Sequence, residues 1–216
     1  MKLIIFDFDG VIADSKSLAC MVLVNVAGDF GITLTVDEAV DKFVGKRLSE
    51  VVSFLEVRLG RTIPGISDLI AQSTLSAFSA DLKEVRGFGG FLQTLGNTQY
   101  CIASSSSPVR LKTSLDVLGL SNTFARNVFS AESVDRGKPF PDIFLYAASQ
   151  MGVQPADCLV IEDSVAGVIA ARAADMAVIG LLAGSHIKVG HKDRLIAAGA
   201  TFVATSYDEI TQFLAT

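Results

Sequence analysis

The sequence predicts an α/β fold with a parallel sheet, interrupted after its first strand by a helical segment. Residues 2–6 form a largely apolar run, and a strand that is buried on both faces need not alternate. From about residue 87 onward, short apolar runs alternate with helical segments, which is typical of parallel sheets with right-handed crossovers. Between residues 15 and about 82 the pattern is helical. We therefore expect a helical domain at 15–84, inserted into an α/β core made of 1–14 and 85–216.

Turn and capping residues delimit the remaining elements. Thr35 and Glu38 form a capping box, and Ser206 and Glu209 form another before the last helix. Other helices of the inserted segment are expected to start near Ser49 and Ser67. Further strands are expected at 100–103, 127–129, 159–161, 177–181 and 202–204, with helices at 108–118, 141–151 and 165–174 between them.

The composition excludes several classes of protein. The 216 residues carry a net charge of -5, which argues against a nucleic-acid partner. The longest apolar stretch, 18–28, is too short to cross a membrane, and the first residues do not form a signal peptide. Cys20, Cys101 and Cys158 are scattered, as expected of a reduced, cytoplasmic chain. No feature of the sequence indicates an oligomeric state.

Two aspartates, Asp7 and Asp9, follow the first predicted strand directly. In an open α/β sheet, ligands bind in the crevice outside the carboxyl ends of the strands. One carboxylate of such a pair can attack a substrate while the other handles a proton or helps to hold a metal. Gly10 then allows the chain to leave the strand sharply.

Further chemical groups follow three later predicted strands: Ser104, Lys138, and the pair Glu162 and Asp163. The four carboxylates of these two acidic pairs would repel one another and raise each other's pKa values unless a cation lay between them. Mg²⁺ prefers oxygen ligands and often shares a substrate phosphate. Lys138 adds a positive charge, and Ser104 adds a hydroxyl donor. The combination indicates a phosphoryl-transfer site.

Each feature also has a simpler structural explanation. A D-x-D pair after a strand is often a turn or a helix cap, and a run of serines is often a polar loop. Lys138 could be a solvated turn residue, and Glu162 with Asp163 could cap the following helix. The order of these features, each after a separate strand and with complementary chemistry, favours the site.

At these residues the chain resembles the haloacid dehalogenase-like superfamily. The matching motifs are D-x-D-G-V-x-x-D-S at 7–15, A-S-S-S at 103–106, G-K-P-x-P-D at 137–142 and E-D-S-x-x-G at 162–167. Their order and spacing are similar to the branch that includes β-phosphoglucomutase and many sugar-phosphate phosphatases. The resemblance implies a Rossmann-like core with a helical cap domain after the first strand.

The resemblance also implies catalytic roles. Asp7 would be the nucleophile that forms an aspartyl-phosphate. Asp9 would protonate the leaving oxygen, activate water and give its backbone carbonyl to Mg²⁺. Lys138 would pair with Asp7 and with the phosphate, which Ser104 and Ser105 would also bind.

The metal site implied by the resemblance is acidic. Asp7, Asp9, Glu162 and Asp163 would hold Mg²⁺, directly or through water. The dehalogenase branch lacks the second aspartate, so Asp9 favours phosphoryl chemistry.

Two features of the mutase branch are absent. β-Phosphoglucomutase has a histidine in its first cap helix where this chain has Ala19, and 44–48 lacks both basic positions of the mutase pattern K-G-x-x-R. Lys46 and Arg47 are candidates to face the substrate from the cap, although an exposed helix-end pair explains them nearly as well. His186 and His191 are expected on the surface or in loops, without a role.

These observations favour a Mg²⁺-dependent phosphatase acting on small phosphorylated metabolites, sugar or sugar-acid phosphates among them. Closure of the cap would exclude water and supply specificity. The alternatives are a phosphosugar mutase, which would return the phosphoryl group to its substrate, and a regulatory module without turnover.

Overall fold

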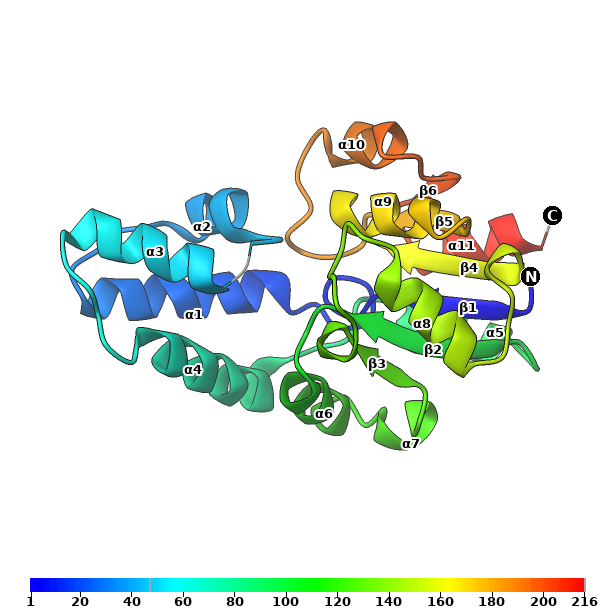
Figure 1. The fold of residues 1–216 in the computed structure, drawn as a ribbon, viewed down its shortest axis with the longest axis horizontal. Coiled ribbons are helices and arrows are strands. Elements are labelled where there is room, and N and C mark those ends of the chain that lie inside the picture. Colours follow the sequence, from blue (N-terminus) through cyan, green and yellow to red (C-terminus); the bar gives the residue numbers. More distant parts are fainter. Residues whose placement is uncertain (47, 216) are drawn as a thin grey trace. The chain divides into compact units, whose positions relative to one another are not determined.

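The computed structural model describes residues 1–46 and 48–215. The chain divides into two compact units (Figure 1). Met1–Asp14 and Lys83–Thr216 form one unit, which contains the sheet, and Ser15–Leu82 forms the other, which is helical. The expected boundary at residue 84 lies just beyond Leu82.

The sheet is parallel throughout, and its strands run in the order β3-β2-β1-β4-β5-β6. Every strand coincides with an expected apolar run to within one or two residues, so the predicted fold class is confirmed. β1 and β4 are buried along their whole length because helices cover both faces of the sheet. The strands are β1 Leu3–Phe6, β2 Gln99–Ser104, β3 Val128–Ser130, β4 Cys158–Glu162, β5 Ala177–Leu181 and β6 Phe202–Ala204.

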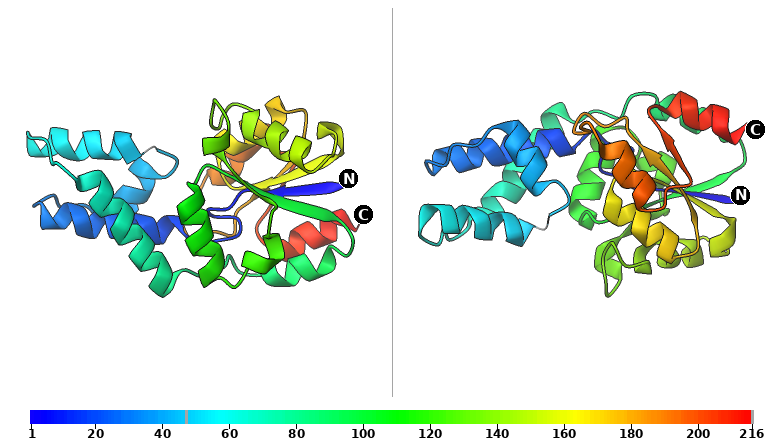
Figure 2. Two further views of the ribbon diagram at one scale, coloured as in Figure 1. Left: turned by 60° about the horizontal axis from the view of Figure 1, so that its bottom comes forward. Right: turned by 90° about the horizontal axis from the view of Figure 1, so that it is seen from above.

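Helices flank this sheet on both faces, as Figure 2 shows. One face is covered by α8 (Asp142–Gln150), α9 (Val165–Ala173) and α10 (His191–Ala197). The opposite face is covered by α5 (Phe88–Thr94), α7 (Ser121–Phe124) and α11 (Tyr207–Leu214), and α6 (Pro108–Val117) packs against α7. Short 3₁₀ turns, η1 (Ala131–Ser133) and η2 (Pro155–Asp157), complete the unit.

An aromatic cluster fills the second of these faces. The Phe6 ring meets Phe88, Phe91 and Phe124 edge-on, with centroids 5.5, 6.1 and 6.5 Å away. Tyr207, at the start of α11, packs on this cluster, and its hydroxyl donates a 2.8 Å hydrogen bond to the carbonyl of Val11. Burial raises the pKa of Tyr207 well above its ordinary value, so the hydroxyl stays a donor. This bond fixes the loop that follows β1.

The helical unit contains α1 (Lys16–Asp29), α2 (Val36–Phe43), α3 (Leu48–Leu59) and α4 (Ile66–Asp81). The predicted capping box is present before α2. Thr35 Oγ1 accepts from the Glu38 N–H at 3.2 Å, and the Glu38 carboxylate accepts from the Thr35 N–H at 2.7 Å. Apolar side chains from its helices form a core of their own. No helix among the described residues is both long and apolar enough to cross a membrane.

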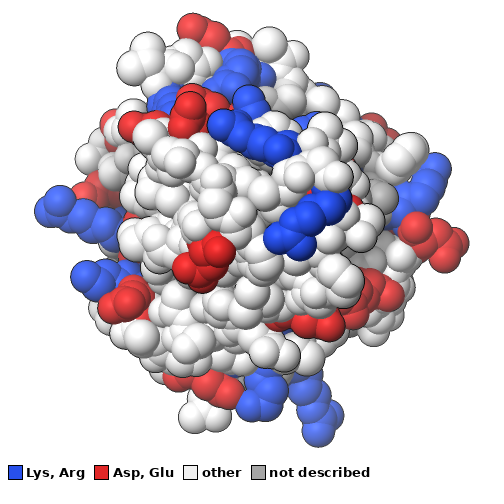
Figure 3. Space-filling view, turned by 90° about the vertical axis from the view of Figure 1, so that its left-hand side faces the viewer, with Lys and Arg blue, Asp and Glu red and all other residues white. Residues whose placement is uncertain are grey.

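Charged side chains of both signs are interspersed with uncharged ones on the face shown in Figure 3. No field of one sign dominates this face. Long-range steering of an anion needs clustered positive charge. The described residues of this face therefore offer no patch for the long-range steering of an anion.

Replacing Tyr207 by Phe should destabilise the protein by about 1–3 kcal/mol, because the Val11 carbonyl would lose a buried donor. The free energy of unfolding, measured with urea, tests this. Tyr146→Phe is the control, since Tyr146 packs on Phe129 through its ring. Equal stability of Tyr207→Phe and the wild type would show that this hydroxyl does not fix the loop.

Candidate active site

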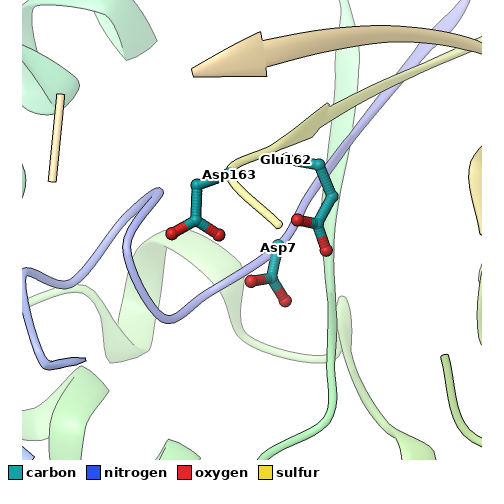
Figure 4. Close-up of side chains that lie close together, drawn as sticks. All are labelled: Asp7, Glu162 and Asp163. Atoms are coloured by element: carbon teal, nitrogen blue, oxygen red, sulfur yellow. The ribbon is translucent and has the colours of Figure 1, made fainter. Parts of the chain in front are cut away.

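The two central strands bring the principal carboxylates together. Phe6 of β1 pairs with Ile161 of β4, so the next residues, Asp7 and Glu162, emerge side by side. The Asp7 N–H continues the ladder with a 3.0 Å hydrogen bond to the Ile161 carbonyl. The strand order reverses between these strands, which is where open α/β sheets form their ligand crevice. Figure 4 shows the side chains of Asp7, Glu162 and Asp163 lying close together.

Lys138, between η1 and α8, supplies a buried cation. Its Nζ lies 2.7 Å from Asp7 Oδ1 and 2.7 Å from Glu162 Oε1, and it donates to the Ala103 carbonyl at 3.2 Å. Burial alone would lower the pKa of Lys138, but the attraction of both carboxylates and the hydrogen bonds to them outweigh burial and raise it above its ordinary value. The ammonium therefore stays charged and keeps Asp7 in place.

The acidic cluster has the chemistry of a divalent metal site. Asp7, Glu162 and Asp163 are buried, and each offers an oxygen within 4.8 Å of the others. These three carboxylates and the Lys138 ammonium leave two formal negative charges, which one divalent cation would balance. Glu162 is already engaged, because its oxygens accept from Lys138 and from the Ser164 N–H, each at 2.7 Å. Asp7 and Asp163 are thus the better placed direct ligands, and Glu162 orients Lys138.

Two histidines hold Asp163. His186 Nε2 lies 2.9 Å from Asp163 Oδ2 with both side chains buried, and His191 Nε2 lies 2.6 Å from the Asp163 carbonyl. His186 lies in a turn after β5, which is one of the two expected positions, but it is buried, at 7% exposed, whereas His191 is half-buried at the start of α10 rather than in a loop. Gly10, at φ +89°, leaves room for this pair, since a Cβ there would overlap the Asp163 carboxylate. The sequence signal for these contacts is the pair of histidines after β5, because the end of a strand of this sheet lies near the acidic residues. The sequence-based prediction did not use this signal.

The Asp9 carboxylate has partners of its own, outside the acidic cluster. Asp9 Oδ2 accepts from the Ser106 hydroxyl at 2.5 Å, and Oδ1 accepts from Arg110 Nη2 at 2.7 Å. Neither Ser106 nor Arg110 has a role predicted from the sequence. Arg110 carried a signal, because it lies in the first turn of α6, where the helix dipole disfavours a cation.

The serine loop after β2 combines buried and exposed hydroxyls. Ser104 is 1% exposed, and its Oγ accepts from the Ser106 N–H at 3.1 Å, whereas Ser105 is exposed. Ser107 caps α6 by accepting from the Arg110 N–H at 3.4 Å. The expected role of Ser104 and Ser105 in phosphate binding stays a prediction.

The cap candidates also stay predictions. Lys46 is exposed and pairs with Glu50 at 3.3 Å within the helical unit. Such an exposed pair contributes little to stability. Arg47 lies outside the described residues.

Comparisons with known proteins identify relatives of this chain. The chain is 27% identical to the 6-phosphogluconate phosphatase of Escherichia coli K12 over 190 residues, covering 87% of this chain and 86% of that protein. It is 29% identical to the β-phosphoglucomutase of Bacillus subtilis 168 over 195 residues, covering 84% and 83%. A haloacid dehalogenase family hydrolase from Deinococcus radiodurans R1, solved with bound phosphate and sodium, has a TM-score of 0.85 and 31% identity, and the match covers 100% of this chain and 95% of that one.

A profile of haloacid dehalogenase-like hydrolases matches residues 4–181. This span runs from β1 through β5 and contains Asp7, Lys138 and Asp163. Enzymes of this kind that act as phosphatases generally use a divalent metal, and the acidic cluster suits one. Both the fold and the sequence therefore place the chain in the haloacid dehalogenase-like hydrolase family.

Proposed function

We propose that this protein is a Mg²⁺-dependent phosphatase of small phosphorylated metabolites, in particular sugar or sugar-acid phosphates. The observation that carries the proposal is the buried carboxylate of Asp7, 2.7 Å from the Lys138 ammonium and within the same cluster as Asp163. The similarity to a 6-phosphogluconate phosphatase supports the substrate class.

Asp7 is the proposed nucleophile. The β1–β4 ladder and Lys138 hold the Asp7 carboxylate at the carboxyl end of β1. The approach of this carboxylate to a phosphorus atom therefore needs little reorganisation. Attack forms the Asp7–phosphorus bond and breaks the bond from phosphorus to the ester oxygen. Lys138 stays beside the reacting centre and offsets the charge that builds up there. Ser104 and the N–H groups at the start of α6 are the proposed ligands of the phosphoryl oxygens.

Asp9 is the proposed proton donor and acceptor. It gives a proton to the departing ester oxygen and then takes one from the water that hydrolyses the aspartyl-phosphate. Its own partners, Ser106 and Arg110, aim its side chain. Bound Mg²⁺, held by Asp7, Asp163 and the Asp9 carbonyl with Glu162 in support, would neutralise phosphate charge.

A phosphosugar mutase is the alternative, favoured by the similarity to β-phosphoglucomutase. This chain has Ala19 in place of the mutase histidine and lacks the basic positions of K-G-x-x-R in 44–48. Water is therefore the preferred acceptor of the phosphoryl group. The product separates the two functions, because a hydrolase releases phosphate and a mutase releases an isomer.

A panel of sugar phosphates, polyol phosphates and sugar-acid phosphates tests the proposal. We expect phosphate release with Mg²⁺ and its loss when EDTA removes the metal, restored when Mg²⁺ is added back. Isomer formation without phosphate release would favour the mutase. Release that persists in EDTA would contradict the metal requirement.

Asp7→Asn should lower kcat by at least ~10⁴-fold, because an amide is a poor nucleophile. Asp9→Asn should lower it by ~10²–10⁴-fold through loss of acid–base catalysis. Asp116→Asn is the matched control, since Asp116 is exposed and pairs with Lys112. Wild-type turnover in Asp7→Asn would exclude the covalent mechanism.

His186→Ala should weaken Mg²⁺ binding by ~10–100-fold, because the Asp163 carboxylate would lose the group that orients it. His186→Gln, whose amide can donate in place of Nε2, should restore part of that affinity. Titration calorimetry of the metal alone measures both. Unchanged affinity in His186→Ala would show that His186 does not orient a ligand.

A further inference from the structure

Arg110 occupies a position that helix stability does not explain. It lies in the first turn of α6, and its Nη2 is 2.7 Å from Asp9 Oδ1. The helix dipole disfavours a cation at this end. The ion pair itself is partly exposed, with 29% of the Arg110 side chain and 15% of the Asp9 side chain accessible, and such pairs contribute little to stability. The position of Arg110 is better explained by a ligand.

The location of Asp9 defines where that ligand must lie. For proton transfer, the leaving ester oxygen has to come within ~3 Å of the Asp9 carboxylate. The carbon skeleton of the substrate begins at that oxygen. Arg110 contacts the same carboxylate, so its guanidinium lies next to the first atoms of the leaving group.

The contacts of Asp9 also limit how the reaction can begin. One of its oxygens accepts from Ser106 and the other from Arg110. While the Arg110 guanidinium is bonded to Asp9 Oδ1, it hinders the approach of the leaving oxygen to that atom. A group that attracts Arg110 away from Asp9 would therefore admit the leaving oxygen to Oδ1.

We propose that Arg110 recognises a carboxylate on the leaving group and exchanges its contact with Asp9 for this second anion. Arginine presents a planar fork of donors that matches a carboxylate with two hydrogen bonds. The proposal rests on the phosphatase function above and narrows its substrates to phosphate esters of carboxylic acids. Arg110 is then a specificity residue, because esters of neutral alcohols cannot draw it from Asp9.

Two pairs of esters that differ in one group test this. 2-Phosphoglycolate is compared with 2-hydroxyethyl phosphate, and 3-phosphoglycerate with glycerol 3-phosphate, because both acids carry the carboxylate within three carbons of the ester oxygen. The variants are Arg110→Met and Arg110→Lys, and the control is Lys112→Met, which removes an exposed cation two residues further along α6. Phosphate release gives kcat/KM for each ester, and activity on the neutral esters also verifies folding.

We expect the wild type to prefer the acid of each pair. Arg110→Met should lower the acid-to-alcohol ratio of kcat/KM by ~10–100-fold, the range for a lost hydrogen bond to a charged group. Arg110→Lys should restore part of the ratio, because lysine keeps the charge but lacks the fork. Lys112→Met should leave the ratio unchanged.

Several outcomes would overturn the proposal. An equal loss on acids and alcohols in Arg110→Met would show that Arg110 only positions Asp9. A larger loss on a sugar bisphosphate than on the acids would assign Arg110 to a second phosphate. If Arg110→Met releases phosphate with an unchanged acid-to-alcohol ratio, the role of Arg110 is wrong but the phosphatase function stands. If the wild type releases phosphate from none of the esters, the phosphatase function is wrong as well.

Discussion

The Lys138 ammonium, between Asp7 and Glu162, is the interaction on which the rest of the site depends. Buried carboxylates repel one another, and a buried charge is costly unless it is paired. Lys138 comes from a segment 131 residues away from Asp7 and meets both carboxylates at 2.7 Å. Without it, the cluster at the centre of the sheet would hold three negative charges in a site with little water.

The strand register and two glycines of the surrounding backbone allow these side chains to lie close together. The register of β1 and β4 places Asp7 beside Glu162, and the loop after β1 leaves space at Gly10 for Asp163. Gly167, at the start of α9, has a similar role, because a Cβ there would overlap the Glu162 carboxylate. The glycines of the two motifs are thus explained by the packing of the acidic side chains.

Contiguous patterns in the sequence were sufficient to predict the strands and the principal motif residues. The short helices α5 and α10 were not expected. The sequence of α5 contains Gly89 and Gly90, which are poor helix formers, and it depends on packing of Phe88 and Phe91 into the aromatic cluster. Apart from the Lys138–Asp7 pair, which the family resemblance implied, side-chain partnerships across loops were also beyond prediction. The contacts of Asp9 with Arg110 and of Asp163 with His186 depend on which loops the folded sheet brings together.

The partners of the two catalytic candidates differ in exposure. Asp7 pairs with an ammonium that is 6% exposed and is also held by Glu162 and the Ala103 carbonyl. Asp9 pairs with a guanidinium that is 29% exposed and borne on a long side chain, which can exchange partners. A nucleophile benefits from a fixed environment, because preorganisation lowers the cost of reaching the transition state. A proton carrier has to make and release contacts in each half of the reaction, and the partner of Asp9 suits that requirement.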